Sequence, residues 1–246
     1  MTSVAESQDL QDGWRIRAEG DRCLVVTLGR ALDADTSRRC LAAARRLRQA
    51  ALAGVTDIVP GLASVAVHYR PSAVVEADGA SPYEVLAARV QAALRGTGDE
   101  GDAQARTVEI PVCYGGEHGP DLQAVAQACG LTPQQVIELH SEPVSRVLML
   151  GFSPGQPYIG IHDERLAVPR RADPRTAVPP GAVAIANRQT VIYPQRLPGG
   201  WHIIGVTPLR LFDPAREPPA VLAPGDFVRF VPIDVKRLDE LRATQP

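Results

Sequence analysis

The stretch from Gly151 to Pro214 is broken into short β-type runs by glycine or proline at nearly every turn. The runs read VAIA, TVIY, HIIGV and LRLF. Proline presets φ and glycine permits positive φ, so these residues define where strands end and how the chain turns. Short strands at regular spacing are typical of a closed β-barrel or a β-sandwich. We therefore expect a mainly β domain over residues 106–246.

The first 95 residues mix strand and helix patterns instead. The expected elements are a strand pair over 14–29, a helix over 35–52, strands over 57–60 and 63–69, and a second helix opened by the capping box Ser81-Pro82-Tyr83-Glu84. This mixture predicts a small α+β domain over residues 1–95. The polar, glycine-rich residues 96–105 are the expected linker between the two domains.

Composition argues against several classes of function. A net charge of −2 gives no electrostatic basis for binding nucleic acid or an anionic membrane. No apolar run approaches the roughly 18 residues that a membrane-spanning helix needs. The opening MTSVAESQDLQDG lacks a basic patch followed by an apolar stretch, so we expect no signal peptide. The cysteines (Cys23, Cys40, Cys113 and Cys129) form no Cys-x-x-Cys pair and indicate reduced thiols in a cytoplasmic protein.

Gly151-Phe152-Ser153-Pro154-Gly155 matches the G-x-S-x-G pattern of a nucleophile elbow. The residue after such a nucleophile must donate its backbone N–H to the oxyanion hole, and Pro154 has no N–H. The following residues form another turn signal rather than a helix. We interpret the segment as a structural turn, and the sequence assigns no catalytic residue.

The chain shows no familiar nucleotide or metal motif. The loop YGGEHG at 114–119 lacks the Gly-Lys-Ser/Thr ending of a phosphate loop. It is either a plain loop or a cleft wall with Glu117 and His118 facing a ligand. The histidines show no metal-ligand spacing, so we expect no metal site. We expect His162 in an exposed loop and His68 packed within its strand.

Polar and aromatic side chains on the rigid turns of the barrel region are the candidates for a small-molecule cleft. Arg175, held by a proline on its N-terminal side, suits bidentate recognition of a carboxylate or phosphate. The alternative is a salt bridge that pins its loop. Trp201 is either core or an apolar cleft wall. The candidate substrate-binding residues are Gly155, Gln156, Tyr158, Arg175, Gln189, Thr190, Trp201 and Arg210.

Long, collinear stretches also carry a resemblance to a known family. They are IPVCYGGEHGPDL at 110–122, MLGFSPGQPYIG at 149–160, PRRADPRTAVPPGAVAIA at 169–186, QTVIYP at 189–194 and PGGWHIIGVTPLRLFDP at 198–214, with a fainter HYRP at 68–71. Together they cover nearly the whole chain. The chain thereby resembles the family called KipI, or allophanate hydrolase subunit 1.

The resemblance implies a cyclophilin-like barrel for the C-terminal domain. It also implies a subunit of an ATP-dependent 5-oxoprolinase, which opens the lactam of 5-oxo-L-proline to L-glutamate. Separate A and C subunits (KipA- or PxpC-like and LamB/YcsF-like chains) would act beside it. ATP, with magnesium, would bind together with those partners, and the isolated chain would be inactive.

Other members of the family give two alternatives. One is a non-catalytic regulatory module that inhibits a sensor histidine kinase. The other is the carboxyltransferase half of a urea carboxylase or allophanate-type system. The chain lacks the Met-Lys-Met signature of a biotin carrier, so we expect no biotin on it.

Three positions depart from the family pattern. Gln156 stands where the family usually has phenylalanine, Ile161 where it often has glycine, and Arg70 where it often has aspartate. A glutamine in place of phenylalanine changes the chemistry of any cleft that it lines.

Overall fold

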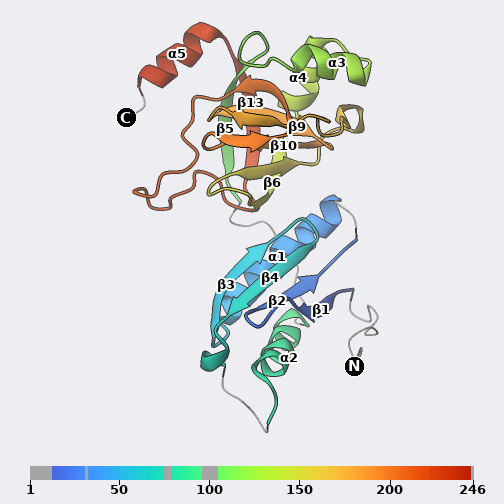
Figure 1. The fold of residues 1–246 in the computed structure, drawn as a ribbon, viewed down its shortest axis with the longest axis vertical. Coiled ribbons are helices and arrows are strands. Elements are labelled where there is room, and N and C mark those ends of the chain that lie inside the picture. Colours follow the sequence, from blue (N-terminus) through green and yellow to red (C-terminus); the bar gives the residue numbers. More distant parts are fainter. Residues whose placement is uncertain (1–12, 31–32, 75–78, 96–104, 245–246) are drawn as a thin grey trace. The chain divides into compact units, whose positions relative to one another are not determined.

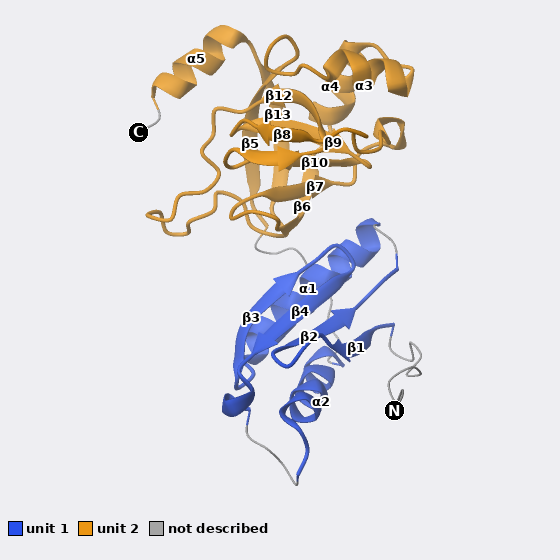
Figure 2. Ribbon diagram, viewed as in Figure 1, with its two compact units in different colours: residues 1–103 blue, residues 104–246 orange. Residues whose placement is uncertain are grey.

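The structure is a computed structural model of the 246-residue chain, and it describes residues 13–30, 33–74, 79–95 and 105–244. The chain divides into two compact units, residues 1–103 and 104–246 (Figure 2). The predicted linker lies outside the described residues except for its last residue, and so does nearly all of the N-terminal stretch tested for a signal peptide.

Within its described residues, the first unit contains a four-stranded antiparallel sheet and two helices (Figure 1). The strand order is β1-β2-β4-β3. Its elements are β1 (Arg15–Ala18), β2 (Cys23–Thr27), α1 (Ala34–Ala50), β3 (Val55–Pro60), β4 (Ser64–Tyr69), a short 3-10 turn (Pro71–Ala73) and α2 (Pro82–Leu94). The predicted strand pair, both helices and both later strands are therefore confirmed.

Side-chain caps define where these helices begin. The Asp33 carboxylate accepts the Thr36 backbone N–H at 2.7 Å and so caps α1. At α2 the predicted capping box is present: the Glu84 carboxylate accepts the Ser81 N–H at 2.8 Å, and the Ser81 hydroxyl accepts the Glu84 N–H at 3.3 Å. Every second residue of β2 is buried, and Leu24 packs in one apolar cluster with helix side chains.

The second unit contains a closed barrel in the order β10-β7-β6-β13-β5-β12-β9, which confirms the β-barrel prediction. The barrel strands are β5 (Thr107–Tyr114), β6 (Ser145–Leu150), β7 (Pro157–Gly160), β9 (Ala182–Ala186), β10 (Gln189–Ile192), β12 (His202–Val206) and β13 (Phe227–Ile233). A separate antiparallel pair joins β8 (Arg175–Val178) to β11 (Leu197–Gly199). The largest apolar cluster of the second unit includes Ile110, Val147, Ile159, Ile204 and Phe230.

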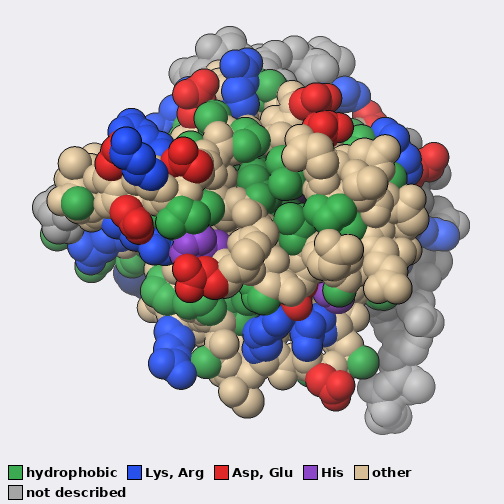
Figure 3. Space-filling model, turned by 90° about the horizontal axis from the view of Figure 1, so that it is seen from above, with side chains coloured by type: hydrophobic (Ala, Val, Ile, Leu, Met, Phe, Trp, Pro, Cys, Tyr) green, Lys and Arg blue, Asp and Glu red, His purple; other side chains and the backbone are tan. Residues whose placement is uncertain are grey.

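In the part of the second unit that the structure describes, three helices accompany the barrel: α3 (Leu122–Cys129), α4 (Pro133–Ser141) and α5 (Val235–Ala243), with a 3-10 turn at Glu164–Leu166 (Figure 1). No helix in the described residues is both long and apolar enough to span a membrane. On the face shown in Figure 3, side chains of both charges lie among apolar ones.

The predicted strand LRLF at 209–212 is wrong. These residues pair with no strand, and one isolated bridge joins Phe212 to Ala220. Prolines at 208 and 214 flank the run and remove backbone donors at both ends. The buried Leu211 anchors the segment against the core instead, so its apolar pattern reflects burial without a ladder.

Candidate functional site

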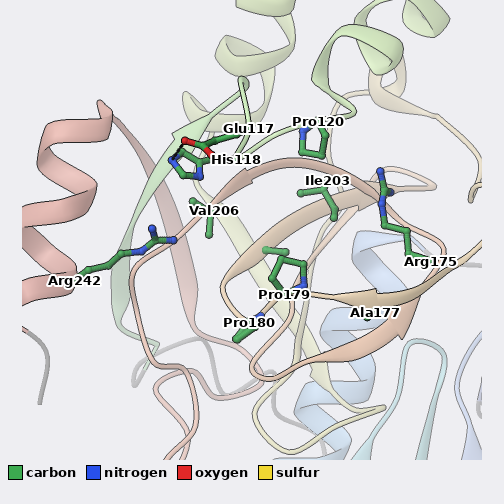
Figure 4. Close-up of a pocket in the computed structure, with 11 residues that line it drawn as sticks. Glu117, His118, Pro120, Arg175, Ala177, Pro179, Pro180, Ile203, Val206 and Arg242 are labelled. Carbon is green, nitrogen blue, oxygen red and sulfur yellow. Dashed lines mark ion pairs between the residues drawn. The ribbon is translucent and has the colours of Figure 1, made fainter.

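A cavity of about 380 Å³ opens in the second unit (Figure 4). Its lining brings together three of the predicted residues, Glu117, His118 and Arg175. The remaining lining residues are Pro120, Ala177, Pro179, Pro180, Ala182, Ile203, Val206 and Arg242. The cavity therefore has charged groups at its rim and largely apolar walls.

Arg175 is held by Asp121 at one end of this cavity. Its two terminal nitrogens each donate to an Asp121 carboxylate oxygen at 2.8 Å, a bidentate pair. Arg171 also donates to Asp121 at 3.2 Å. The backbone N–H of Ile203 donates to the same carboxylate at 2.7 Å. Of the two interpretations of Arg175, the observed geometry is that of a loop-fixing salt bridge.

The electrostatics of this cluster follow from its contacts. Burial by itself raises the pKa of Asp121, but the hydrogen bonds from Arg175 and Ile203 and the arginine charges outweigh it and hold the pKa below its ordinary value. The hydrogen bond and charge of Asp121 in turn raise the pKa of Arg175. The carboxylate stays ionised and forms an ion pair with the guanidinium beside the cavity.

The glycine-rich loop after β5 places Glu117 and His118 on the cavity wall. Gly115 and Gly116 have positive φ (70° and 54°), which suits glycine. At Gly119 an added Cβ would lie 2.1 Å from the carbonyl oxygen of Ile204, so only glycine allows the loop to approach β12 this closely. Glu117 is 84% exposed, and its carboxylate lies 3.9 Å from the His118 ring (dashed in Figure 4).

Helix α5 contributes Arg242 to the cavity lining, on the side away from Arg175 in Figure 4. Leu238 of this helix is fully buried and packs with Cys113 and Val206. Arg242 lies four residues later, on the same helix face, and its guanidinium extends toward the cavity in Figure 4. Among the described residues Arg242 has no side-chain hydrogen bond or ion pair, in contrast to Arg175.

The two aromatic candidates, Tyr158 and Trp201, pack elsewhere in this unit. Tyr158 and Trp201 meet edge to face at 5.9 Å between ring centroids, and Arg170 lies 5.4 Å over the Trp201 ring. Trp201 is 5% exposed and belongs to an apolar cluster with Tyr193. It is a core residue and does not line the cavity.

Gln189 and Thr190 are neighbours in β10, so their side chains leave opposite faces of the strand. Thr190 is fully buried, and its hydroxyl lies 2.8 Å from His140 Nε2 and 2.7 Å from His162 Nε2. Gln189 is buried as well, and its Nε2 has no partner among the described residues. The two side chains therefore do not share one cleft.

The expected positions of two histidines are wrong. His162 is 2% exposed rather than in an exposed loop, because its ring joins the hydrogen-bonded group around Thr190. Burial, with a contribution from the Arg188 charge, lowers its pKa to about 4. His68 is exposed rather than packed, because the alternation of β4 turns Val67 and Tyr69 to the core and His68 away from it.

The last three candidates also lie outside the cavity lining. Arg210 is exposed and pairs with Asp213 at 3.2 Å. Gly155 has a φ of 74°, and its backbone lies against Phe212. Gln156 is 2% exposed, so this departure from the family pattern is buried.

Sequence reasoning missed Asp121 and Arg242. Asp121 precedes α3 and reads as a helix cap, but its side chain makes no capping bond and binds the arginines instead. The sequence feature that could have indicated a role for Asp121 is its position after Pro120, directly behind the glycine-rich loop. Arg242 gives no signal in sequence, because it reaches the cavity only through the packing of α5.

The similarity to known proteins extends over most of the chain. Residues 14–222 match the model of the carboxyltransferase domain, subdomain C and D. The B component of 5-oxoprolinase from Bacillus subtilis is 38% identical over 226 residues, 91% of this chain and 94% of that protein. The B component of 5-oxoprolinase from Escherichia coli O157:H7 is 43% identical over 216 residues, 87% of this chain and 93% of that protein.

A solved structure supports the fold alone. The Kluyveromyces lactis urea carboxylase superposes with a TM-score of 0.71 at 17% identity. The match covers 92% of this chain and 22% of that one.

Proposed function

Because the chain belongs to the carboxyltransferase-domain family, subdomain C and D, we propose that it acts as the B component of a 5-oxoprolinase. The observation that carries this proposal is the extent of the match to two proteins named for that role. Each is matched over more than nine-tenths of its own length (94% and 93%). The agreement therefore spans both units rather than one shared module.

The proposal includes dependence on ATP and on separate A and C components. A lactam carbonyl is a poor electrophile, and phosphorylation of its oxygen would create a leaving group, which explains a coupling to ATP. Of the charged residues that line the cavity, Arg175 is paired with Asp121 and Glu117 is negative, which leaves Arg242 as a single cation without an ion pair among the described residues, too little positive charge for a polyphosphate. ATP is accordingly assigned to a site formed with partner chains.

The catalytic groups are also assigned to the partner chains, because Ser153 lacks the surroundings of a nucleophile. Ser153, the serine of the G-x-S-x-G pattern, accepts a hydrogen bond from Gln195 Nε2 at 3.1 Å. A serine nucleophile donates its proton to a general base, and the Ser153 hydroxyl has no such acceptor among the described residues. Pro154 supplies no N–H for an oxyanion. The described residues contain no group of three or more His, Cys, Asp or Glu side chains that could hold a metal ion.

Reconstitution tests the proposal. The chain is purified with the A and C components, and formation of ADP and glutamate is measured with 5-oxoproline as the substrate. We expect turnover only when all three chains and ATP are present, with no turnover by this chain alone. Each chain is omitted in turn as a control, and urea replaces 5-oxoproline to test the urea carboxylase alternative.

Two outcomes contradict the proposal. Turnover by the isolated chain would show that it carries the catalytic groups itself. Full activity of the A and C components without it would remove it from the enzyme and favour the regulatory alternative.

A further inference from the structure

We propose that the cavity beside Glu117 and His118 binds the carboxylate of a small cyclic amide, with Arg242 as the residue that holds the anion. The identity of the cyclic amide rests on the proposed function, whereas the charge and position of the site rest on the structure. This assignment replaces the sequence-based hypothesis in which Arg175 holds the anion.

Arg175 is poorly suited to that role because its hydrogen-bonding fork is occupied. Both terminal nitrogens donate to Asp121 at 2.8 Å. A ligand carboxylate would have to displace a carboxylate that also binds Arg171 and the Ile203 N–H. Arg175 therefore shapes one end of the cavity, and its guanidinium is already paired with Asp121.

Arg242 offers what Arg175 lacks. Its guanidinium reaches the cavity from α5 (Figure 4) and has no side-chain hydrogen bond or ion pair within the described ranges. The buried Leu238, one helical turn earlier, fixes the face of α5 that meets the barrel. An arginine positioned by a packed helix and free of such partners is suited to a carboxylate ligand.

Charge and shape indicate a monoanion with an apolar body. The Arg242 guanidinium and the Glu117 carboxylate line the same cavity, so a polyphosphate would meet repulsion without enough cations. Pro179, Pro180 and Ile203 supply rigid apolar walls against which a five-membered ring can pack. The His118 ring at the rim is available to hydrogen-bond the amide group of such a ligand.

Binding to the full-length isolated chain tests this inference without requiring activity. Calorimetry and ligand-observed NMR are carried out with 5-oxo-L-proline and with 2-pyrrolidinone, the same lactam without the carboxylate. We expect 5-oxo-L-proline to bind and 2-pyrrolidinone to bind much more weakly. Arg242→Gln should weaken 5-oxo-L-proline binding roughly 10- to 150-fold, the usual range for losing a charged hydrogen bond.

Lys236→Gln is the matched control, because it removes an exposed cation from the same helix away from the cavity. It should leave binding unchanged, and melting curves of both variants should match the parent. Equal affinity for both lactams, no binding of 5-oxo-L-proline, or an unaffected Arg242→Gln variant would overturn the assignment. Tighter binding of ATP that depends on Arg242 would overturn it in favour of a phosphate site.

The assembled enzyme separates this inference from the proposed function. If the three-chain complex is active and Arg242→Gln leaves its KM for 5-oxoproline unchanged, the cavity assignment fails and the function stands. If the complex is inactive but the isolated chain binds 5-oxo-L-proline through Arg242, the cavity stands and the function fails.

Discussion

Asp121 links three segments of the second unit by accepting hydrogen bonds from Arg171, Arg175 and the Ile203 backbone. Asp121→Asn would remove the one negative charge that pairs with two partly buried arginines. We expect it to lower the free energy of unfolding by about 3 kcal/mol, as for breaking a buried ion pair. Urea denaturation measures this loss.

Asp163→Asn serves as the control, because Asp163 pairs with Arg165 on the exposed surface. It should leave the free energy of unfolding nearly unchanged, because solvent screens an ion pair at the surface. Arg175→Lys keeps the charge and loses the planar fork, so it should lower thermal stability while leaving the KM of the complex intact. Equal losses at Asp121 and Asp163, or a kinetic defect without a stability change in Arg175→Lys, would contradict this account.

Ser153 gives the second residue-scale prediction. Ser153→Ala removes one hydrogen bond, that from Gln195, so the free energy of unfolding should fall by roughly 0.5–1.5 kcal/mol. Activity of the assembled enzyme should stay within a few-fold, measured by steady-state kinetics. A loss near the roughly 10⁴-fold that follows removal of a true nucleophile would restore the nucleophile-elbow interpretation.

The buried histidines give a pH-dependent stability. Burial lowers the pKa values of both His140 and His162 below the ordinary value, and the pKa of His162 falls to about 4. The charge of the neighbouring His162 lowers the pKa of His140 further. The unfolded chain takes up protons near pH 6.5 and the folded chain does not, so stability is complete above pH 6.5 and falls as the pH drops toward 4. For His162 alone, the free energy of unfolding should fall by about 3 kcal/mol over this pH range.

Urea denaturation between pH 7.5 and 5 measures this effect, since carboxylates titrate lower. His162→Gln should flatten the dependence, and His68→Gln, at an exposed site, should leave it unchanged. A slope unaffected by His162→Gln would place its origin elsewhere.

At the scale of elements, local signals predicted most of the fold. The capping box at Ser81 and the apolar spacing of residues 35–52 depend only on neighbours in sequence, and both helices form. The LRLF run was wrongly predicted as a strand because Leu211 is buried by tertiary packing, without a strand partner for the run. The pairing of Asp121 with Arg175 spans 54 residues, so no local pattern could predict it.

The loop after β5 gives a prediction at this scale. Gly119→Ala would force a Cβ against the Ile204 carbonyl and push the loop away from β12. We expect a loss of roughly 2–3 kcal/mol in the free energy of unfolding, as for overpacked sites, together with weaker ligand binding at the cavity. Gly116→Ala is the control without a steric clash, since nothing lies within 4 Å of its added Cβ.

Gly116 has a φ of 54°, so its substitution should cost only about 1 kcal/mol of backbone strain. If Gly119→Ala is no more destabilising than Gly116→Ala, the close approach of this loop to β12 does not shape the cavity.

At the scale of the whole molecule, each unit has a hydrophobic core of its own. One core includes Leu24, Leu47 and Val67, and the other includes Ile110, Ile204 and Phe230. Separate cores are the usual basis of independent folding. The division predicted from the polar residues 96–105 is therefore open to a direct test by cutting the chain there.

We expect the fragment 106–246 to fold alone, because its barrel closes with strands from that fragment only. Its circular dichroism should show β structure, and it should melt cooperatively. The same measurements on a fragment beginning at residue 116 are the control, since that cut removes β5 and opens the barrel between β13 and β12. An unfolded 106–246 fragment would show that the barrel needs the first unit, and an equally stable control would show that β5 is dispensable.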